Sequence, residues 1–248
     1  MPNNIERLPK QMTIAKPNKV KKTWVYLIVP AIIFAVFFSY SYFSASKKSN
    51  LEAEIAQFPG MKLLLEQHPE IREQFIQDAI IINNGGPDAA AAQSRFAALI
   101  KPYFRQYIGQ ASDESLIEFV DQFLVALDEV RGKSPQFCSM GINDQANGIA
   151  IVLSPSTAKG LTNAMSKVIE TAIANPQPQP NDEWAAQRLQ QVMEVIYAKN
   201  DPNFTTDFTN PTIKPENICY SAIIIYKTMK ETLSAAEFGS VLRYISVP

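Results

Sequence analysis

Acid–base chemistry in this 248-residue chain would have to start from one histidine, because His68 is the only one. It stands in the segment Gln-His-Pro, at the junction of two expected helices. An imidazole acts as a general base near neutral pH when a hydroxyl, a thiol or a water lies beside it. No serine or cysteine motif surrounds His68, so a catalytic triad has no supporting pattern. We expect a surface or capping residue.

A serine–lysine pattern is the second chemical signal. Ser156-Thr157-Ala158-Lys159 is similar to the Ser-x-x-Lys pattern of penicillin-binding enzymes, in which the lysine helps to remove the proton of the serine. Those enzymes also carry Lys-Thr-Gly on a strand, whereas Lys227-Thr228-Met229 lies in a helical pattern and has methionine in place of glycine. Ser44 and Lys47 match the short pattern equally well, so we regard both matches as chance.

No catalytic residue is predicted, and Glu114 is the residue that comes nearest to one. Together with Ser115 at a helix start, it is similar to the acid of lytic transglycosylases, all-α cell-wall enzymes in which a carboxylic acid protonates a glycosidic oxygen. The segment of Gly-Leu-Met-Gln type that should follow is absent from the sequence. A first-turn acid that interacts favourably with the helix dipole explains Glu114 better.

The two cysteines, Cys138 and Cys219, predict a structural disulfide. An even number of cysteines is typical of chains outside the reducing cytoplasm. The bond would close a loop of about 80 residues, worth at most about 4.5 kcal/mol by chain entropy. Two buried free thiols are the alternative. No metal site is predicted, because the spacing is unlike that of a zinc site and one histidine is available.

Charge is distributed unevenly along the chain. The formal net charge is −1, but residues 1–22 hold six of the 23 basic residues and one of the 24 acids. The remaining 17 basic and 23 acidic residues give a balance of −6. No cluster of lysine and arginine follows residue 50, so we expect no nucleic-acid partner. Asn84-Gly85-Gly86-Pro87 lacks the length and the lysine of a phosphate-binding loop, and no cofactor is predicted.

Residues 23–46 carry no charge and predict a transmembrane signal-anchor that contacts the lipid bilayer. At about 1.5 Å per residue, 20 helical residues span the roughly 30 Å of hydrocarbon. The basic residues 1–22 predict a cytoplasmic tail and therefore a single-pass protein of the inner (plasma) membrane with a periplasmic or other extracytoplasmic domain. Aromatic side chains that favour the headgroup region lie near both ends of the segment: Trp24, Tyr26, Tyr40, Tyr42 and Phe43.

Two other interpretations of this apolar segment stay open. Ser44-Ala45-Ser46 offers small residues to a signal peptidase, although the long basic region and the bulky aromatics nearby favour an anchor over cleavage. A buried helix of a soluble protein is the other interpretation, which the flanking basic clusters disfavour. A eukaryotic type II membrane protein is an alternative to the bacterial one.

Helical periodicity dominates after residue 50, so we predict an all-α fold: one transmembrane helix followed by an irregular helical bundle, in one body or two contiguous lobes. The break Gly132-Lys133-Ser134-Pro135 suggests lobes at 47–134 and 135–248. Residues 51–58 could continue the membrane helix until Pro59-Gly60 stops it. The pattern leaves 136–155 open and predicts helices at 63–67, 70–82, 88–109 with a kink or division at Pro102, 113–131, 156–175, 182–200, 215–233 and 236–245.

The functional expectation is a membrane-tethered, extracytoplasmic helical domain that binds a protein partner as a non-enzymatic interaction or scaffolding module. The segment Tyr103-Phe104-Arg105-Gln106-Tyr107 is a candidate partner patch, with core packing as the favoured alternative. A cell-wall hydrolase similar to lytic transglycosylases is the second function. A small-molecule or lipid carrier is the third, and it requires a large apolar cavity between the helices.

Overall fold

The computed structural model describes residues 51, 53, 55–85, 87–142, 153–208 and 210–246. These residues form helices and contain no strand, which confirms the predicted all-α class for this part of the chain. The predicted cytoplasmic tail (1–22) and signal-anchor (23–46) lie outside the described residues. Within the described ranges, no helix combines the length and the apolar character needed to cross a membrane.

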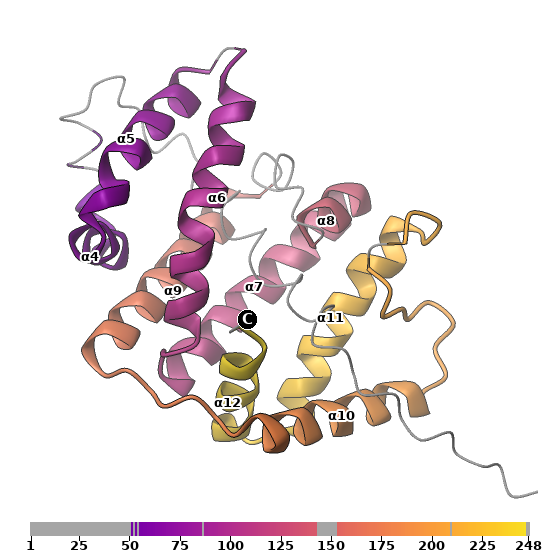
Figure 1. Ribbon diagram of the computed structural model, residues 1–248. Helices are drawn as coiled ribbons and strands as arrows, with labels where there is room; N and C mark the ends of the chain where they lie inside the picture. Colours follow the sequence, from indigo (N-terminus) through magenta and orange to yellow (C-terminus); the bar gives the residue numbers. More distant parts are fainter. Residues whose placement is uncertain are drawn as a thin grey trace, which may run out of the picture.

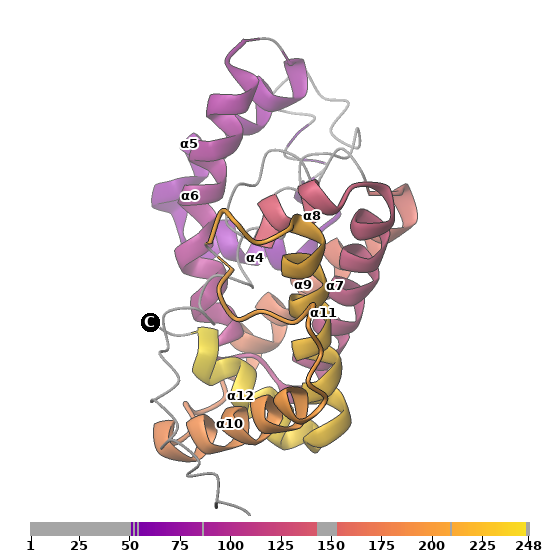
Figure 2. The ribbon, with the colours of Figure 1, turned by 90° about the vertical axis from the view of Figure 1, so that its right-hand side faces the viewer.

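The helices form an elongated bundle (Figures 1 and 2). The hairpin of α5 and α6 lies at one end, and α10 and α12 lie at the other. Between them α7 packs against α9, and α11 packs against α8. The helix bounds are α4 Pro59–Gln67, α5 Pro69–Asn84, α6 Ala89–Ile108, α7 Asp113–Lys133, α8 Pro135–Ile142, α9 Pro155–Ala174, α10 Asp182–Ala198, α11 Pro215–Thr232 and α12 Ala235–Ser246.

Helix α7 follows directly from its sequence. The Ser112 hydroxyl caps its start by accepting the Ser115 N–H at 3.2 Å, and acids occupy its first turn. Basic residues occupy its last turn, where they favour the negative end of the helix dipole. The predicted apolar stripe is buried, at Leu116, Val120, Phe123, Leu127 and Val130.

Three local predictions differ from the structure, each because of a proline or a glycine. The helix predicted at 63–67 already starts at Pro59, since proline is well tolerated where the first N–H has no helical partner. Pro102 lies inside a continuous α6 and does not divide it. Gly132 is helical, and the chain breaks at Ser134 before Pro135 opens α8 in the segment that the pattern left open.

One hydrophobic cluster joins the described helices. A row of rings runs through it from Phe104 of α6 to Phe119 and Phe123 of α7 and on to Tyr226 of α11, with centroid separations of 5.8, 6.0 and 5.5 Å. Helices on both sides of residue 134 therefore contribute to the same core. The division into lobes at 134 stays a prediction.

Helix α4 is held against α9 by a close backbone contact at Gly60. The Gly60 N–H donates to the Ser166 hydroxyl at 2.6 Å, and that hydroxyl donates to Glu170 at 2.9 Å. A Cβ at position 60 would lie 2.3 Å from the Ser166 carbonyl oxygen, so only glycine fits there without movement. This contact fixes the start of α4, whose other end carries His68.

Candidate functional site

His68 lies at the junction of α4 and α5, at the centre of a polar cluster with Glu70, Tyr103 and Tyr107, which we call the His68 cluster. Its Nε2 lies 3.0 Å from the Tyr107 hydroxyl, and its Nδ1 lies 3.3 Å from Glu70 Oε1. The Tyr103 hydroxyl donates to the same carboxylate oxygen at 3.2 Å. The imidazole also packs on the Tyr103 ring, with 4.1 Å between centroids. The sole histidine therefore contacts three other polar side chains.

Local helix geometry holds these side chains in place. The His68 N–H donates to the Leu64 carbonyl at the end of α4, and the His68 carbonyl accepts the Ile71 N–H at the start of α5. His68 is thus a capping residue for two helices, as the sequence predicts. Tyr103 and Tyr107 lie four residues apart, on the same side of α6, because that spacing brings side chains to one face.

An ion pair between a buried carboxylate and a half-exposed arginine joins α5 to α6 farther along the same hairpin. Asp78 is fully buried and accepts hydrogen bonds from the Arg95 guanidinium at 2.6 and 3.0 Å and from Gln74 at 2.8 Å. Because its carboxylate is satisfied by several donors, the cost of burying this charge is offset. The pair sets the register in which α6 presents its two tyrosines to His68.

The electrostatics of the His68 cluster keep its phenols neutral. Burial raises the pKa of the Tyr107 hydroxyl, and the charge of Glu70 raises it further. Burial and then the hydrogen bond to Glu70 raise the pKa of Tyr103. The pKa of Glu70 is lowered, chiefly by a backbone hydrogen bond at the start of α5 and also by Tyr103 and His68. The cluster is therefore an ionised carboxylate surrounded by donors at neutral pH.

The Glu70 carboxylate, the His68 imidazole and the Tyr107 hydroxyl are linked in the order acid, base, hydroxyl that a nucleophilic triad has. The hydroxyl here belongs to a phenol. Tyr107 is 5% exposed, and its raised pKa opposes formation of the phenolate that would attack a substrate. The Tyr107 hydroxyl and His68 Nε2 share one hydrogen bond, and the tautomer of the imidazole decides which of the two donates. The arrangement stabilises the junction of α4, α5 and α6.

The other chemical signals of the sequence lie apart from one another. Glu114 is exposed in the first turn of α7. Ser156 and Lys159 are exposed in the first two turns of α9, and the Ser156 hydroxyl lies 3.3 Å from that of Ser154. Lys227 belongs to α11 and forms an ion pair with Asp128 at 3.2 Å. The structure therefore assembles no hydrolytic site from these residues.

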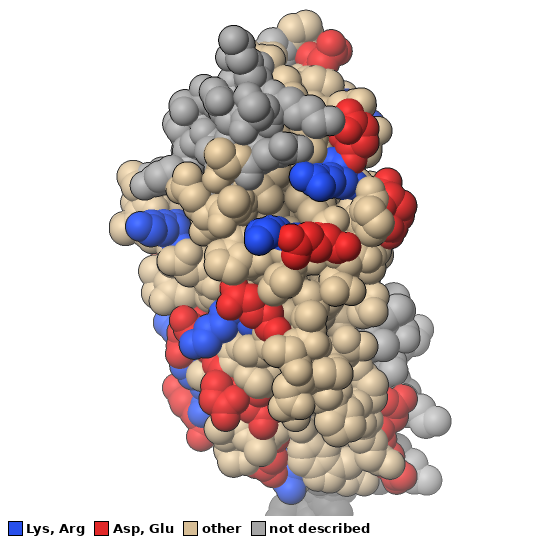
Figure 3. Space-filling view, turned by 90° about the vertical axis from the view of Figure 1, so that its left-hand side faces the viewer, with Lys and Arg blue, Asp and Glu red and all other residues tan. Residues whose placement is uncertain are grey.

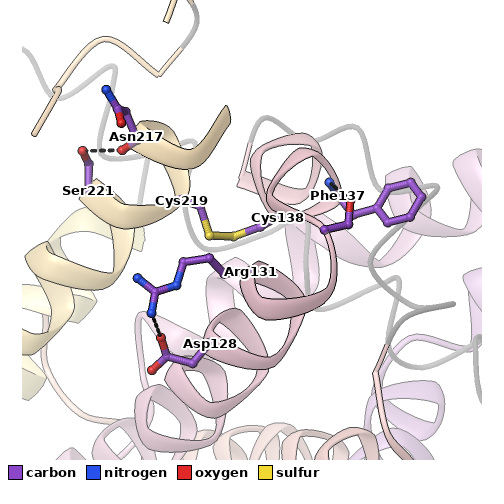
Figure 4. Close-up of a disulfide and its surroundings, with 8 residues drawn as sticks. Asp128, Arg131, Phe137, Cys138, Asn217, Cys219 and Ser221 are labelled. Carbon is purple, nitrogen blue, oxygen red and sulfur yellow. Dashed lines mark hydrogen bonds and ion pairs between the residues drawn. A yellow bond between two sulfur atoms is a disulfide. The ribbon is translucent and has the colours of Figure 1, made fainter. Parts of the chain in front are cut away.

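The predicted disulfide is present and buried (Figure 4). Cys138 of α8 and Cys219 of α11 are both 0% exposed, and their Cα atoms are 5.7 Å apart, within the usual range for a disulfide. The Phe137 side chain points away from the bond and is 36% exposed. The bond links two helices that are 81 residues apart in the chain.

A small pocket lies next to α4, with a volume of about 130 Å³. Small-molecule sites usually enclose about 300 to 1,000 Å³, so this pocket is too small for a typical cofactor. Both charges and apolar carbons line it: Ile55, Ala56, Lys62, Leu65, Glu66 and Arg72. Within the described part of the chain, no three His, Cys, Asp or Glu side chains are placed to hold a metal ion.

Two of the five residues in the candidate partner patch at 103–107 belong to the core, and Gln106 is exposed. Phe104 is 1% exposed and Tyr107 is 5% exposed, in agreement with the favoured alternative of core packing. Sequence reasoning missed that Glu70, Tyr103 and Tyr107 surround His68. The spacing of the two tyrosines could have placed them on one face of a helix, but nothing in the sequence pairs that face with His68.

Comparisons of this chain with protein-family models, with curated proteins and with solved structures found no match. Function is therefore inferred from the residues of the chain and their geometry. The buried disulfide, the His68 cluster and the pocket beside α4 are the features that bear on it.

Proposed function

We propose that this chain is a single-pass membrane protein whose helical domain, residues 51–246, lies outside the cytoplasm and serves as a non-enzymatic interaction or scaffolding module. Residues 23–46 are its anchor and residues 1–22 its cytoplasmic tail. The partner is a protein of the same extracytoplasmic compartment.

The observation that carries this proposal is the buried Cys138–Cys219 disulfide. Cytoplasmic proteins keep their thiols reduced, whereas structural disulfides are typical of the periplasm and of secreted domains. Both cysteines lie in the core of a domain, residues 51–246, whose 15 basic and 23 acidic residues give a charge balance of −8. A basic tail and an uncharged segment precede it. Each of these features favours the same topology.

The geometry of the polar residues supports a binding role over catalysis. The His68 cluster holds three helices together through a phenol with a raised pKa, and Glu114 occupies an exposed helix start where the dipole explains it. A scaffold needs a rigid surface, which the disulfide and the continuous core supply.

Topology is tested by thiol labelling in intact cells. Each native cysteine is buried, so the reporter is an exposed Ala198→Cys at the end of α10, in a chain with both Cys138→Ser and Cys219→Ser. We expect a membrane-impermeant maleimide to label this variant without lysis. A matched Asn4→Cys reporter in the tail should label only after lysis. Labelling of Ala198→Cys only after lysis would place the domain in the cytoplasm and refute the proposal.

Catalysis is tested separately with the full-length protein and purified peptidoglycan. We expect no release of soluble fragments from the wild type or from Glu114→Gln. Release by the wild type that disappears in Glu114→Gln would replace the scaffolding role with the hydrolase, because the amide cannot donate a proton to the glycosidic oxygen.

A further inference from the structure

The distance between the proposed anchor and the folded core is short. The anchor ends at Ser46, and Leu51 is already part of the core at 1% exposed, followed by Ile55 at 6%. A fully extended chain advances at most about 3.6 Å per residue, so five steps from Ser46 to Leu51 reach about 18 Å. Whatever conformation residues 47–50 adopt, the core starts within that distance of the anchor.

Residues 47–50 connect the anchor to the core, and we call them the tether. The tether is shorter than the domain is wide. A compact domain of the size of residues 51–246 has a radius of gyration of about 16 Å and measures roughly 40 Å across. A tether of at most about 18 Å therefore cannot let the domain turn over at the membrane. The side on which Leu51 enters the core has to face the bilayer.

That side carries α4. The Phe58 N–H donates to the Ile55 carbonyl at 2.9 Å, so the entering chain turns directly into α4, which starts at Pro59. We define the α4 face as Ile55, Ala56, the exposed side of α4 and the start of α5. Figure 3 views the molecule from the side of α4 and α5 and shows lysine and arginine next to acidic side chains.

The chemistry of the α4 face fits lipid headgroups. The pocket there has Ile55 and Leu65 beside exposed cations and an anion, with Lys62 and Glu66 3.7 Å apart. A phosphocholine or phosphoethanolamine headgroup carries both charges, so Lys62 and Glu66 can each face an opposite charge while all of them stay hydrated. An apolar membrane-inserting patch would need contiguous hydrophobic side chains instead.

We infer that the short tether holds the α4 face against the phospholipid headgroups on the outer side of the membrane, so that the end of α10 and the segment leading to α11 point away from it. This orientation rests on the proposed function, because it requires residues 23–46 to be the anchor. In Figure 1 α4 lies on the left and the end of α10 on the right, and in Figure 2 that right-hand side faces the viewer.

Orientation is measured by fluorescence quenching of the full-length protein in phosphatidylcholine vesicles that contain headgroup spin-labelled lipid. A small fluorescent amino acid replaces Ala56, three residues before α4, in one variant and Ala198, the last residue of α10, in another; both alanines are exposed. We expect strong quenching at position 56 and little at position 198. Equal quenching at the two positions, or stronger quenching at 198, would overturn the orientation.

A lengthened tether tests whether its shortness is the cause. A Gly/Ser insertion of about 20 residues between Ser49 and Asn50 has an end-to-end distance of about 25 Å, which lets the domain turn. Quenching at position 56 should then fall toward the value at 198, and unchanged quenching would overturn the inference. Vesicle flotation separates the two proposals: chains that do not float overturn the anchor itself, whereas chains that float with equal quenching overturn only the orientation.

Discussion

The Arg243 guanidinium of α12 lies 2.7 Å from the Asp113 carboxylate at the start of α7. Arg243 is 5% exposed and also donates to the Ala111 carbonyl at 2.9 Å. The last helix of the domain is thereby fixed to the turn that begins α7. The buried charge of Arg243 stabilises the fold only while Asp113 and the Ala111 carbonyl are in place to bind it.

Arg243→Ala should lower the free energy of unfolding by about 3 kcal/mol, because it leaves Asp113 without its cation and removes buried side-chain packing. Urea denaturation of the detergent-solubilised full-length protein measures this. Arg188→Ala is the matched control, since Arg188 of α10 pairs with Glu237 of α12 at 3.0 Å and its side chain is 35% exposed, against 6% for Arg243. The control should cost less than about 1 kcal/mol. Equal effects of the two substitutions would contradict the buried pair.

Gly60→Ala should destabilise the protein by about 2 kcal/mol, because its Cβ would meet the Ser166 backbone and push α4 from α9. Gly132→Ala is the control within α7, where nothing lies within 4 Å of a new Cβ. It should stabilise by about 0.5 to 1 kcal/mol, since alanine is the better helix former. Thermal unfolding followed by circular dichroism would show opposite shifts, and shifts of the same sign would argue against the close approach.

Tyr107→Phe should cost about 1 kcal/mol, because it removes the hydrogen bond to His68 Nε2 at a buried position. Tyr103→Phe removes a bond to the exposed Glu70 and should cost less than about 0.5 kcal/mol. Chemical denaturation of both variants ranks them. If Tyr103→Phe were the more damaging, the His68–Tyr107 contact would not be the one that holds the junction.

Glu129 should make stability depend on acid pH. Burial alone would raise its pKa, but hydrogen bonds from Lys133, Thr157 and Ser154 outweigh it and lower the pKa to about 2. Because the pKa of Glu129 is lower in the folded chain, the unfolded chain is protonated first as pH falls. The contribution of Glu129 to the free energy of unfolding is therefore complete above the ordinary pKa and is lost as pH falls from about 4.5 to 2.

The measurement for Glu129 compares wild type with Glu129→Gln by denaturation between neutral pH and pH 2. The difference in unfolding free energy should be about 2 kcal/mol at neutral pH and should shrink below pH 4.5, since the amide does not titrate. If the difference in unfolding free energy stayed constant over this pH range, the charge of the Glu129 carboxylate would not be what stabilises the fold.

Reduction of the Cys138–Cys219 bond should lower the free energy of unfolding by up to about 4.5 kcal/mol. The reason is that the unfolded chain gains conformational entropy when the long loop is no longer closed. Denaturation of the wild type with and without reductant measures the change. The chain with both cysteines replaced by serine should match the reduced wild type and should not respond to reductant. A reductant effect in that chain would point to a cause other than the disulfide.

Much of the secondary structure could be predicted because its signals are local. The stripe from Leu116 to Val130 has helical spacing, Ser112 caps it, and α7 is found where the pattern places it. Helix α6 is continuous through Pro102, so the alternative in which this proline divides the helix is wrong, and a kink there stays a prediction. The helix after Pro135 was missed because eight residues are too few to show a period.

By itself the sequence determined the all-α class, most helix bounds and the disulfide, the last because two cysteines allow one intramolecular pairing. The tertiary structure decided which helix faces meet. It places Tyr107 beside His68 from 39 residues away, Asp113 against Arg243, and Gly60 against Ser166. Helical periodicity fixes which side of a helix is apolar, but contacts between helices depend on how all of them pack together.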